Sequence, residues 1–337
     1  MTGGGAPGAA GILTCLQKNI SFHITVADAN PEAIGRYLNK DFETIPLATD
    51  PIFPEAILSL CRKKEIHVVM PLVTKELIPL SQKIKEFELA GTKLLLSPVA
   101  SLEIANNKSR LYEFFQWRSI AVPEFRVVET IEQFKTEVEE LGYPQKQICF
   151  KPSVSNGSRG FRIINEQIDE LDLLFNHKPS SIYISLTEAT RILSSGNFPE
   201  LLISEYLPGE EYSVDCLANH GESILVVPRL RKKMINGISV EGEFIKEENI
   251  IAYSSQIIRE LKLHGNIGIQ VKKSITGQFL ILEINPRVQG TIVAALGAGI
   301  NLPELAVKQE MGLPISPGEV QVKWGTRFSR YWNEIFY

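Results

Sequence analysis

The sequence has few of the features that mark disulfide-rich, zinc-binding, secreted or membrane proteins. Its four cysteines are far apart and show no CxxC spacing, so neither a disulfide framework nor a zinc site is expected. No apolar run approaches the roughly 20 residues of a membrane-spanning helix. The glycine-rich N-terminus lacks the basic and apolar regions of a signal peptide. These absences favour a cytoplasmic protein.

Charge of one sign is not concentrated anywhere. The 35 Lys and Arg residues nearly balance the 39 Asp and Glu residues. The densest basic cluster, Arg229, Arg231, Lys232 and Lys233, is too small for a nucleic-acid-binding surface. Hydrophobic residues make up 44 %, which is typical of globular proteins. We therefore expect small-molecule substrates, with neither a nucleic acid nor a membrane as partner.

The first hundred residues alternate short β-like runs with helix-like runs, which predicts a parallel α/β layer. The expected strands are 21–27, 42–47, 67–71 and 92–96, and the expected helices are 14–18, 54–64 and 75–89. A helical stretch at 101–118 follows, in which Asn107 is placed to cap the second half.

The remaining sequence predicts a small α+β lobe and a strand-rich lobe. The small lobe has expected strands 125–128, 148–151 and 161–165 and a helix 131–141. The strand-rich lobe has expected strands 201–206, 212–218, 224–230, 267–273 and 279–284, helices 250–263, 291–298 and 302–311, and an edge strand within 323–332. We predict four segments: a Rossmann-like domain 1–98, a connector 99–122, a small lobe 123–198 and a large lobe 199–337.

The residues Gly3–Gly8 satisfy the dinucleotide fingerprint GxGxxG, and Asp28 lies at the spacing of its acidic residue. That fingerprint requires a preceding strand, but only Met1 and Thr2 precede the glycines. We therefore expect a truncated first strand and a tight turn into a helix. A nicotinamide oxidoreductase remains a weak alternative.

The string Glu283-Ile284-Asn285-Pro286-Arg287 ends an apolar strand. Residues two apart on a strand share a face, so the carboxylate of Glu283 and the amide of Asn285 point the same way. Such oxygens suit Mg²⁺ held between protein and nucleotide phosphates, and an arginine fork fits a phosphoryl group. An ordinary Asn-Pro turn is the alternative. A hairpin near residues 276–277 would place Gln270 beside Glu283 as a further oxygen ligand.

Three other segments carry polar chemistry. Lys151 ends a strand before the Ser/Gly-rich loop 153–160, whose backbone N–H groups suit phosphate oxygens; a plain hairpin loop is the alternative. Residues 204–212 join two strands through Pro-Gly, as a hinge or a simple hairpin. Arg229 and Arg231 share one strand face, where they hold a substrate carboxylate or face solvent.

In order and spacing, these motifs resemble the ATP-grasp superfamily, in its branch similar to carbamoyl-phosphate synthase large subunits. The resemblance covers nearly the whole chain and implies a Rossmann-like domain before a two-lobed ATP-grasp fold. It implies an ATP-dependent ligase that activates a carboxylate as an acyl phosphate for attack by an amine. A kinase that stops at the phosphorylated product and a non-catalytic nucleotide-binding module are the alternatives.

The resemblance also implies roles for individual residues, with ATP and two Mg²⁺ or Mn²⁺ ions as cofactors. The phosphate lysines are Lys108 and Lys151, the lid residues are Ser153, Ser155, Gly157, Ser158 and Gly160, the adenine hinge is Glu205, Tyr206 and Leu207, and the ribose acceptor is Glu211. The metal ligands are Gln270, Glu283 and Asn285, the catalytic residues are Lys151, Asn285 and Arg287, and the substrate arginines are Arg229, Arg231 and Arg287.

The sequence also departs from the family pattern. Gln270 stands where many members carry an acidic residue, and the chain holds one ATP-grasp unit where synthase large subunits hold two. A genuine carbamoyl-phosphate synthase is therefore not expected. The family analogy implies a homodimer.

Overall fold

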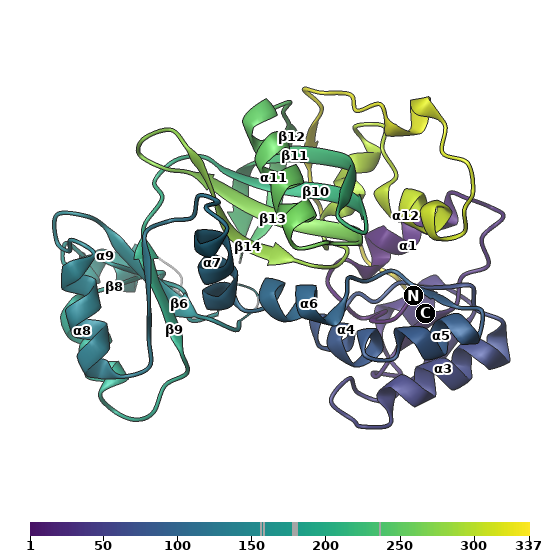
Figure 1. Cartoon of the computed structure of the whole chain (residues 1–337), viewed down its shortest axis with the longest axis horizontal. Coiled ribbons are helices and arrows are strands. Elements are labelled where there is room, and N and C mark those ends of the chain that lie inside the picture. The colour runs from purple at the N-terminus through teal and green to yellow at the C-terminus, as the bar shows by residue number, and fades with distance from the viewer. Residues whose placement is uncertain (156, 158, 177–180, 236) are drawn as a thin grey trace. The chain divides into compact units, whose positions relative to one another are not determined.

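The computed structural model describes residues 1–155, 157, 159–176, 181–235 and 237–337 (Figure 1). The chain divides into two compact units. Unit 1 comprises Met1–Asn106, Glu210–Val271 and Glu283–Tyr337, and unit 2 comprises Asn107–Gly209 and Lys272–Leu282. The four-segment division expected from the sequence uses different bounds and stays a prediction.

Unit 1 begins with a parallel α/β layer, as predicted. In it β1 (Val26–Asp28) pairs with β2 (Phe42–Thr44), and β3 (Val68–Val69) pairs with β4 (Lys93–Leu94). Thr2 forms parallel bridges with both Ala27 and Pro71, so a single residue occupies the place of the truncated first strand. The accompanying helices are α1 (Ala9–Gln17), α2 (Ile34–Leu38), α3 (Phe53–Lys64), α4 (Thr74–Ser81), α5 (Ile84–Leu89) and α6 (Val99–Ala105).

Two helices of this layer differ from their predicted bounds. The helix expected at 75–89 is split into α4 and α5. Pro79 lies inside α4, where its missing N–H weakens the helix, and a tight bond from Lys83 N–H to the carbonyl of Leu80 closes it. The helix expected at 14–18 begins at Ala9, because the glycine turn ends at Gly8.

A six-stranded sheet follows, in the order β14-β13-β10-β11-β12-β15. Its strands are β10 (Glu211–Asn219), β11 (Glu222–Ile235), β12 (Ile238–Phe244), β13 (Gly265–Lys273), β14 (Phe279–Asn285) and β15 (Arg327–Ser329). The boundary between the units cuts β13 after Val271 and β14 before Glu283. The predicted edge strand is confirmed as β15, whereas β12 was not predicted.

Helices α11 (Glu248–Glu260) and α12 (Leu302–Glu310) complete unit 1 with two 3₁₀ helices, η1 (Ile292–Leu296) and η2 (Pro317–Val320). The prediction of an α-helix at 291–298 is therefore wrong, because this segment forms the 3₁₀ helix η1, which ends at Leu296. Helix α1 lies beside α12 (Figure 1), and both contribute to one hydrophobic core with residues of the sheet.

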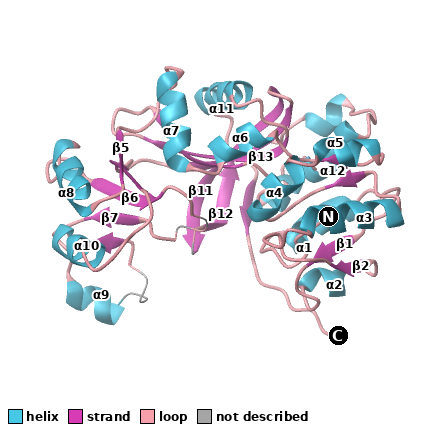
Figure 2. Ribbon diagram, turned by 60° about the horizontal axis from the view of Figure 1, so that its bottom comes forward, coloured by secondary structure: helices cyan, strands magenta, loops and turns pink. Residues whose placement is uncertain are grey.

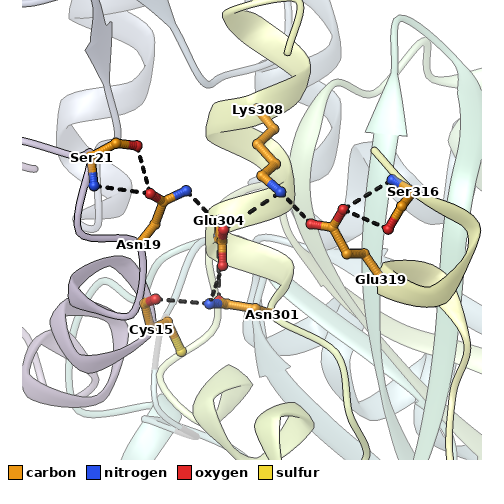
Figure 3. A network of polar contacts seen from close by, with 8 residues as sticks. All are labelled: Cys15, Asn19, Ser21, Asn301, Glu304, Lys308, Ser316 and Glu319. Atoms are coloured by element: carbon orange, nitrogen blue, oxygen red, sulfur yellow. Dashed lines mark hydrogen bonds and ion pairs between the residues drawn. The ribbon is translucent and has the colours of Figure 1, made fainter. Parts of the chain in front are cut away.

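Polar contacts fix the end of α1 to the start of α12 (Figure 3). Asn301, the N-cap of α12, donates from Nδ2 to the carbonyl of Cys15 at 2.8 Å and to Oε2 of Glu304 at 2.8 Å. Asn19 donates to the other oxygen of Glu304 at 3.0 Å. Two segments 285 residues apart in the sequence are thereby held together.

Unit 2 is built on a five-stranded sheet in the order β5-β9-β6-β7-β8. Its elements are α7 (Lys108–Trp117), β5 (Phe125–Val128), α8 (Ile131–Glu140), β6 (Ile148–Pro152), β7 (Arg162–Ile164), α9 (Glu170–Asn176), β8 (Tyr183–Ile184), α10 (Leu186–Leu193) and β9 (Leu201–Glu205). Helices α8 and α10 pack on one face (Figure 2), around a core that includes Val128. Tyr112 of α7 meets the opposite face through an edge contact with Phe125.

Candidate functional site

The lysines and lid serines of unit 2 gather where β6 ends and α7 begins. Asn107 caps α7 by accepting from Arg110 N–H at 3.0 Å, as predicted. Lys108, the next residue, is buried, and its Nζ donates to the carbonyl of Ser155 at 2.8 Å. Its N–H donates to the carbonyl of Ser153 at 2.8 Å. The fold thus brings the predicted phosphate lysine to the predicted lid.

Lys151 reaches toward the strand that carries the predicted metal ligands. Its Nζ donates to the carbonyl of Leu282 at 3.0 Å and lies 5.6 Å from the ring centre of Tyr112. Leu282 directly precedes Glu283 in β14. The lysine is therefore anchored to the backbone beside Glu283.

Two glycines of the lid loop adopt backbone conformations that side chains disfavour. Gly157 has φ 65° and Gly160 has φ 76°. A Cβ on Gly160 would also lie 2.6 Å from Cδ of Pro152. The predicted lid residue Ser158 lies outside the described residues.

The segment from Glu205 to Glu211 connects two different sheets. Glu205 ends β9 of the five-stranded sheet, and Glu211 begins β10 of the six-stranded sheet, so the simple hairpin is wrong. Tyr206 N–H donates to the carbonyl of Gln147 at 2.8 Å, which occupies one backbone group of the predicted adenine hinge. Leu207 is buried.

Arg231 organises a polar cluster on the large sheet of unit 1. Its Nη1 donates to Oε1 of Glu211 and, at 3.2 Å, to Oε1 of Gln270. Nε donates to Ser239 Oγ at 3.0 Å, and Nη2 donates to the carbonyl of Gly237. The predicted ribose acceptor and one predicted metal ligand therefore share this arginine, whose nitrogens all have partners.

The end of β14 holds the remaining predicted ligands. Asn285 donates from Nδ2 to Oε1 of Glu283 at 3.3 Å, which confirms that the two side chains share a face. Arg287 donates from Nε to Oγ1 of Thr74 at 3.1 Å and from Nη1 to the carbonyl of Val288 at 2.9 Å. Burial lowers the pKa of Arg287, and the charges of Glu283 and Glu76 oppose this effect.

Arg229 is fully buried rather than placed on a solvated face. Its Nε donates to Oδ2 of Asp215 at 3.2 Å, and its Nη2 donates to Oγ1 of Thr291 at 2.7 Å. Gln289 donates to the other oxygen of Asp215 at 3.2 Å. Burial raises the pKa of Asp215, while the charge of Arg229 opposes that rise.

The glycine turn at residues 3–8 makes its close contacts with other parts of the protein. Gly5 N–H donates to Oδ2 of Asp28 at 2.7 Å, so the acidic residue closes the turn. A Cβ on Gly8 would lie 2.2 Å from Cα of Gly290, so the loop after β14 packs directly against the start of α1. The expected tight turn into a helix is confirmed.

The donors predicted to bind metal fit Mg²⁺ by their chemistry. One carboxylate and two amide side chains supply hard oxygens. Among the described residues, no group of three or more His, Cys, Asp and Glu side chains is arranged to hold a metal. Sequence reasoning missed Asp215 and Thr291, which accept hydrogen bonds from Arg229, and Gln289, which donates to Asp215.

Comparisons with known proteins agree with this fold. Residues 197–331 match the family described as ATP-grasp in the biosynthetic pathway with Ter operon, and residues 9–95 match the PylC-like N-terminal domain. The carbamoyl phosphate synthase large chain of Clostridium botulinum (strain Alaska E43 / Type E3) is 22 % identical over 313 residues, which are 89 % of this chain and 27 % of that protein. The chain thus spans about a quarter of the length of this curated relative.

Solved structures show the same architecture at low sequence identity. The ADP complex of the N5-carboxyaminoimidazole ribonucleotide synthetase purK is 16 % identical, with a TM-score of 0.71 over 95 % of this chain and 78 % of that one. The biotin carboxylase–β,γ-ATP complex from Campylobacter jejuni is 15 % identical, with a TM-score of 0.67 over 93 % of this chain and 71 % of that one. The family models therefore identify an ATP-grasp domain within residues 197–331 and a PylC-like N-terminal domain within residues 9–95, and the solved structures show the fold of ATP-grasp enzymes over nearly the whole chain.

Proposed function

We propose that the chain is an ATP-dependent ligase that phosphorylates a carboxylate and joins it to an amine. The observation that carries this proposal is the cluster in unit 2, where the buried Lys108 holds the lid carbonyl of Ser155 and Lys151 reaches the backbone of Leu282. Two cationic side chains beside a Ser/Gly loop suit the phosphates of a nucleotide. Their arrangement supports the roles that the family resemblance implies.

Glu283, Asn285 and Gln270 would hold Mg²⁺. When bound, the ion neutralises charge on the nucleotide phosphates and on the transferred phosphoryl group. Lys108, Lys151 and Arg287 keep that group in line with the incoming carboxylate. The lid around Gly157 and Gly160 excludes water from an acyl phosphate that hydrolyses readily.

The proposed reaction has two steps, phosphoryl transfer and attack by the amine. A carboxylate oxygen attacks the γ-phosphorus, the bond to the β-phosphate oxygen breaks, and ADP leaves. The amine nitrogen then attacks the carbonyl carbon, inorganic phosphate leaves, and the proton of the amine passes to solvent. Arg229, Arg231 and Arg287 stay the proposed substrate arginines.

We also propose that the protein is cytoplasmic and forms a homodimer. No helix of the described residues is long and apolar enough to cross a membrane. All four cysteines are buried and unpaired, which supports a reducing cytoplasmic environment. A homodimer is proposed on the family resemblance.

The test is ADP release and hydroxamate formation in MgATP with pooled carboxylates and hydroxylamine. We expect both products from the wild type and neither from Glu283→Ala. ADP without hydroxamate would favour a kinase or a simple ATPase. A MgATP-dependent rise in Tm without ADP would favour a nucleotide-binding module.

A further inference from the structure

Lys272 is a half-buried lysine near the end of β13, and none of the roles assigned above uses it. Its Nζ donates to Oη of Tyr206 at 3.1 Å and lies 4.3 Å from the centre of the Tyr206 ring. Within the described ranges of the chain, no carboxylate forms an ion pair with Lys272. A lysine ammonium has three N–H donors, and the phenol uses one of them. The remaining donors can therefore serve a ligand.

Two polar groups of the predicted adenine hinge already have partners in the protein. Oε1 of Glu205 accepts from the N–H of Glu124 at 3.0 Å, so this carboxylate is held at the start of β5. The N–H of Tyr206 donates to the carbonyl of Gln147 at 2.8 Å. The hydroxyl of Tyr206, in contrast, accepts from Lys272. Lys272 is therefore a charged donor held at the hinge by a hinge side chain.

Lys272 also lies close to the predicted phosphate lysine Lys151. Burial raises the pKa of the Cys149 thiol, and its hydrogen bond with Ser204 opposes that rise. The positive charges of Lys151 and Lys272 oppose the rise as well, so both ammonium groups are near enough to act on one thiol. Sγ of Cys149 lies 3.8 Å from the carbonyl oxygen of Glu205, in the hinge. In unit 2, Lys272 thus lies among the residues to which we assign the nucleotide.

The alternation of β13 brings Lys272 to the same face of the strand as Gln270. Residues two apart on a strand share a face. Val271, between them, is fully buried, whereas Gln270 and Lys272 are both half-buried. Lys273 points to the opposite face, where its Nζ lies 5.6 Å from the ring centre of Phe279. The strand face that carries a predicted metal ligand therefore also carries Lys272.

We propose that Lys272 donates a hydrogen bond to a ring nitrogen of the adenine base, N7 or N3, and that Tyr206 positions it. A lysine side chain has no acceptor, so it can meet only an acceptor atom of the base, and N7 and N3 are such atoms. The base is the partner because a hinge side chain holds the ammonium. This inference rests on the proposed nucleotide site and names a residue that determines its base specificity.

The test is calorimetric binding of nucleoside diphosphates to the full chain in the presence of Mg²⁺. The probes are ADP, 7-deaza-ADP and 3-deaza-ADP, because each analogue replaces one ring nitrogen by a C–H group and so removes one acceptor. The variant is Lys272→Met, which keeps an unbranched apolar stem and removes the ammonium. Lys273→Met is the matched control, since the neighbouring lysine points to the other face of β13.

We expect wild type and Lys273→Met to bind MgADP equally and to bind one of the two analogues about tenfold more weakly, as loss of a charge-assisted hydrogen bond requires. Lys272→Met should bind MgADP about tenfold more weakly and should not distinguish it from that analogue, because the donor is gone. A loss with 7-deaza-ADP identifies N7, and a loss with 3-deaza-ADP identifies N3. A Lys272→Met variant that still discriminates against the analogue would overturn the proposal.

The wild-type measurements need no variant, and they separate this inference from the proposed function. If wild type binds both analogues as tightly as ADP, the contact of Lys272 is wrong and the nucleotide site stands. If wild type does not bind MgADP at all, the nucleotide site is wrong, and the proposed function with it. Tyr206→Phe keeps the ring but removes the acceptor for Lys272, so we expect it to weaken the discrimination. Full discrimination in Tyr206→Phe would contradict the positioning role of Tyr206.

Discussion

The Nε of Arg287 donates to Oγ1 of Thr74 at 3.1 Å, which fixes the loop after β14 to the first residue of α4. This bond orients the guanidinium proposed to meet the transferred phosphoryl group. Thr74→Val keeps the side-chain shape but removes the acceptor. We expect it to lower kcat for ADP release about tenfold, as loss of a hydrogen bond to a charged group does. MgATP affinity should change little.

Thr74→Ser is the control for this prediction, because it restores the acceptor. Recovery of kcat in Thr74→Ser is expected. A Thr74→Val variant with unchanged kcat would show that the bond does not orient Arg287 for catalysis.

Lys151 should be required for turnover rather than for folding. Its Nζ contacts the backbone beside Glu283, where we place the phosphates. We expect Lys151→Met to lower ADP release about 100-fold or more, because a charge contact made in the transition state is removed. Lys146→Met is the matched control, since this exposed lysine of unit 2 pairs with Glu124. Equal activity of the two variants would remove Lys151 from the site.

Glu76 predicts a pH dependence of stability. Burial raises its pKa from an ordinary 4.5 to about 7, although the hydroxyl of Thr2 donates to it at 2.6 Å. The folded state therefore binds the proton more tightly than the unfolded state. The stability that this proton contributes is complete below about pH 4.5 and is lost as the pH rises through about 7.

Glu76→Gln removes the charge and keeps an oxygen for Thr2. We expect it to raise the free energy of unfolding at pH 8 by up to about 3 kcal/mol and to have little effect at pH 4.5. Urea unfolding at both pH values measures this difference, with the exposed Glu103→Gln as control. A gain of equal size at both pH values would contradict the assignment.

Gly160 should tolerate no side chain. Its positive φ and the closeness of Pro152 both oppose a Cβ. We expect Gly160→Ala to destabilise the protein by about 1–2 kcal/mol and to raise the KM for MgATP, because the lid backbone must move. Gly196 is a suitable control in unit 2, since a Cβ there meets nothing within 4 Å. A Gly160→Ala variant that matches Gly196→Ala in Tm and KM would show that the loop adapts without cost.

Local patterns predicted much of the fold. The cap at Asn107 and the strand at 125–128 depend on neighbouring residues alone, and both are confirmed. Strand β12 was missed although its sequence alternates; its pairing with β11 shifts register between Arg231 and Lys233 and again between Lys233 and Met234. The 3₁₀ form of η1, which lies between Gly290 and Gly297, was also missed, because apolar periodicity does not distinguish a short 3₁₀ helix from an α-helix.

The site was harder to predict, because its pairs come from register and long-range packing. The sequence motif placed Glu283 and Asn285 on one face, but no local signal pairs Arg229 with Asp215, 14 residues away. In the same way, the N–H of Arg330 meets the carbonyl of Val240 only because β15 pairs with β12. The catalytic and ligand roles themselves stay predictions until the variants above are measured.

The contact between Gly8 and Gly290 has a consequence for gene shuffling among relatives. A methyl group at position 8 would lie 2.2 Å from Cα of Gly290, so Gly8 accepts no side chain, whereas a methyl group at position 290 would make only ordinary contacts at 3.4 Å. In a chimera with residues 1–17 from one parent and residues 286–297 from another, the two segments that pack against each other come from different proteins. Their contact surfaces then need not be complementary. Functional recombinants should therefore keep both segments from the same parent, although most of the gene separates them.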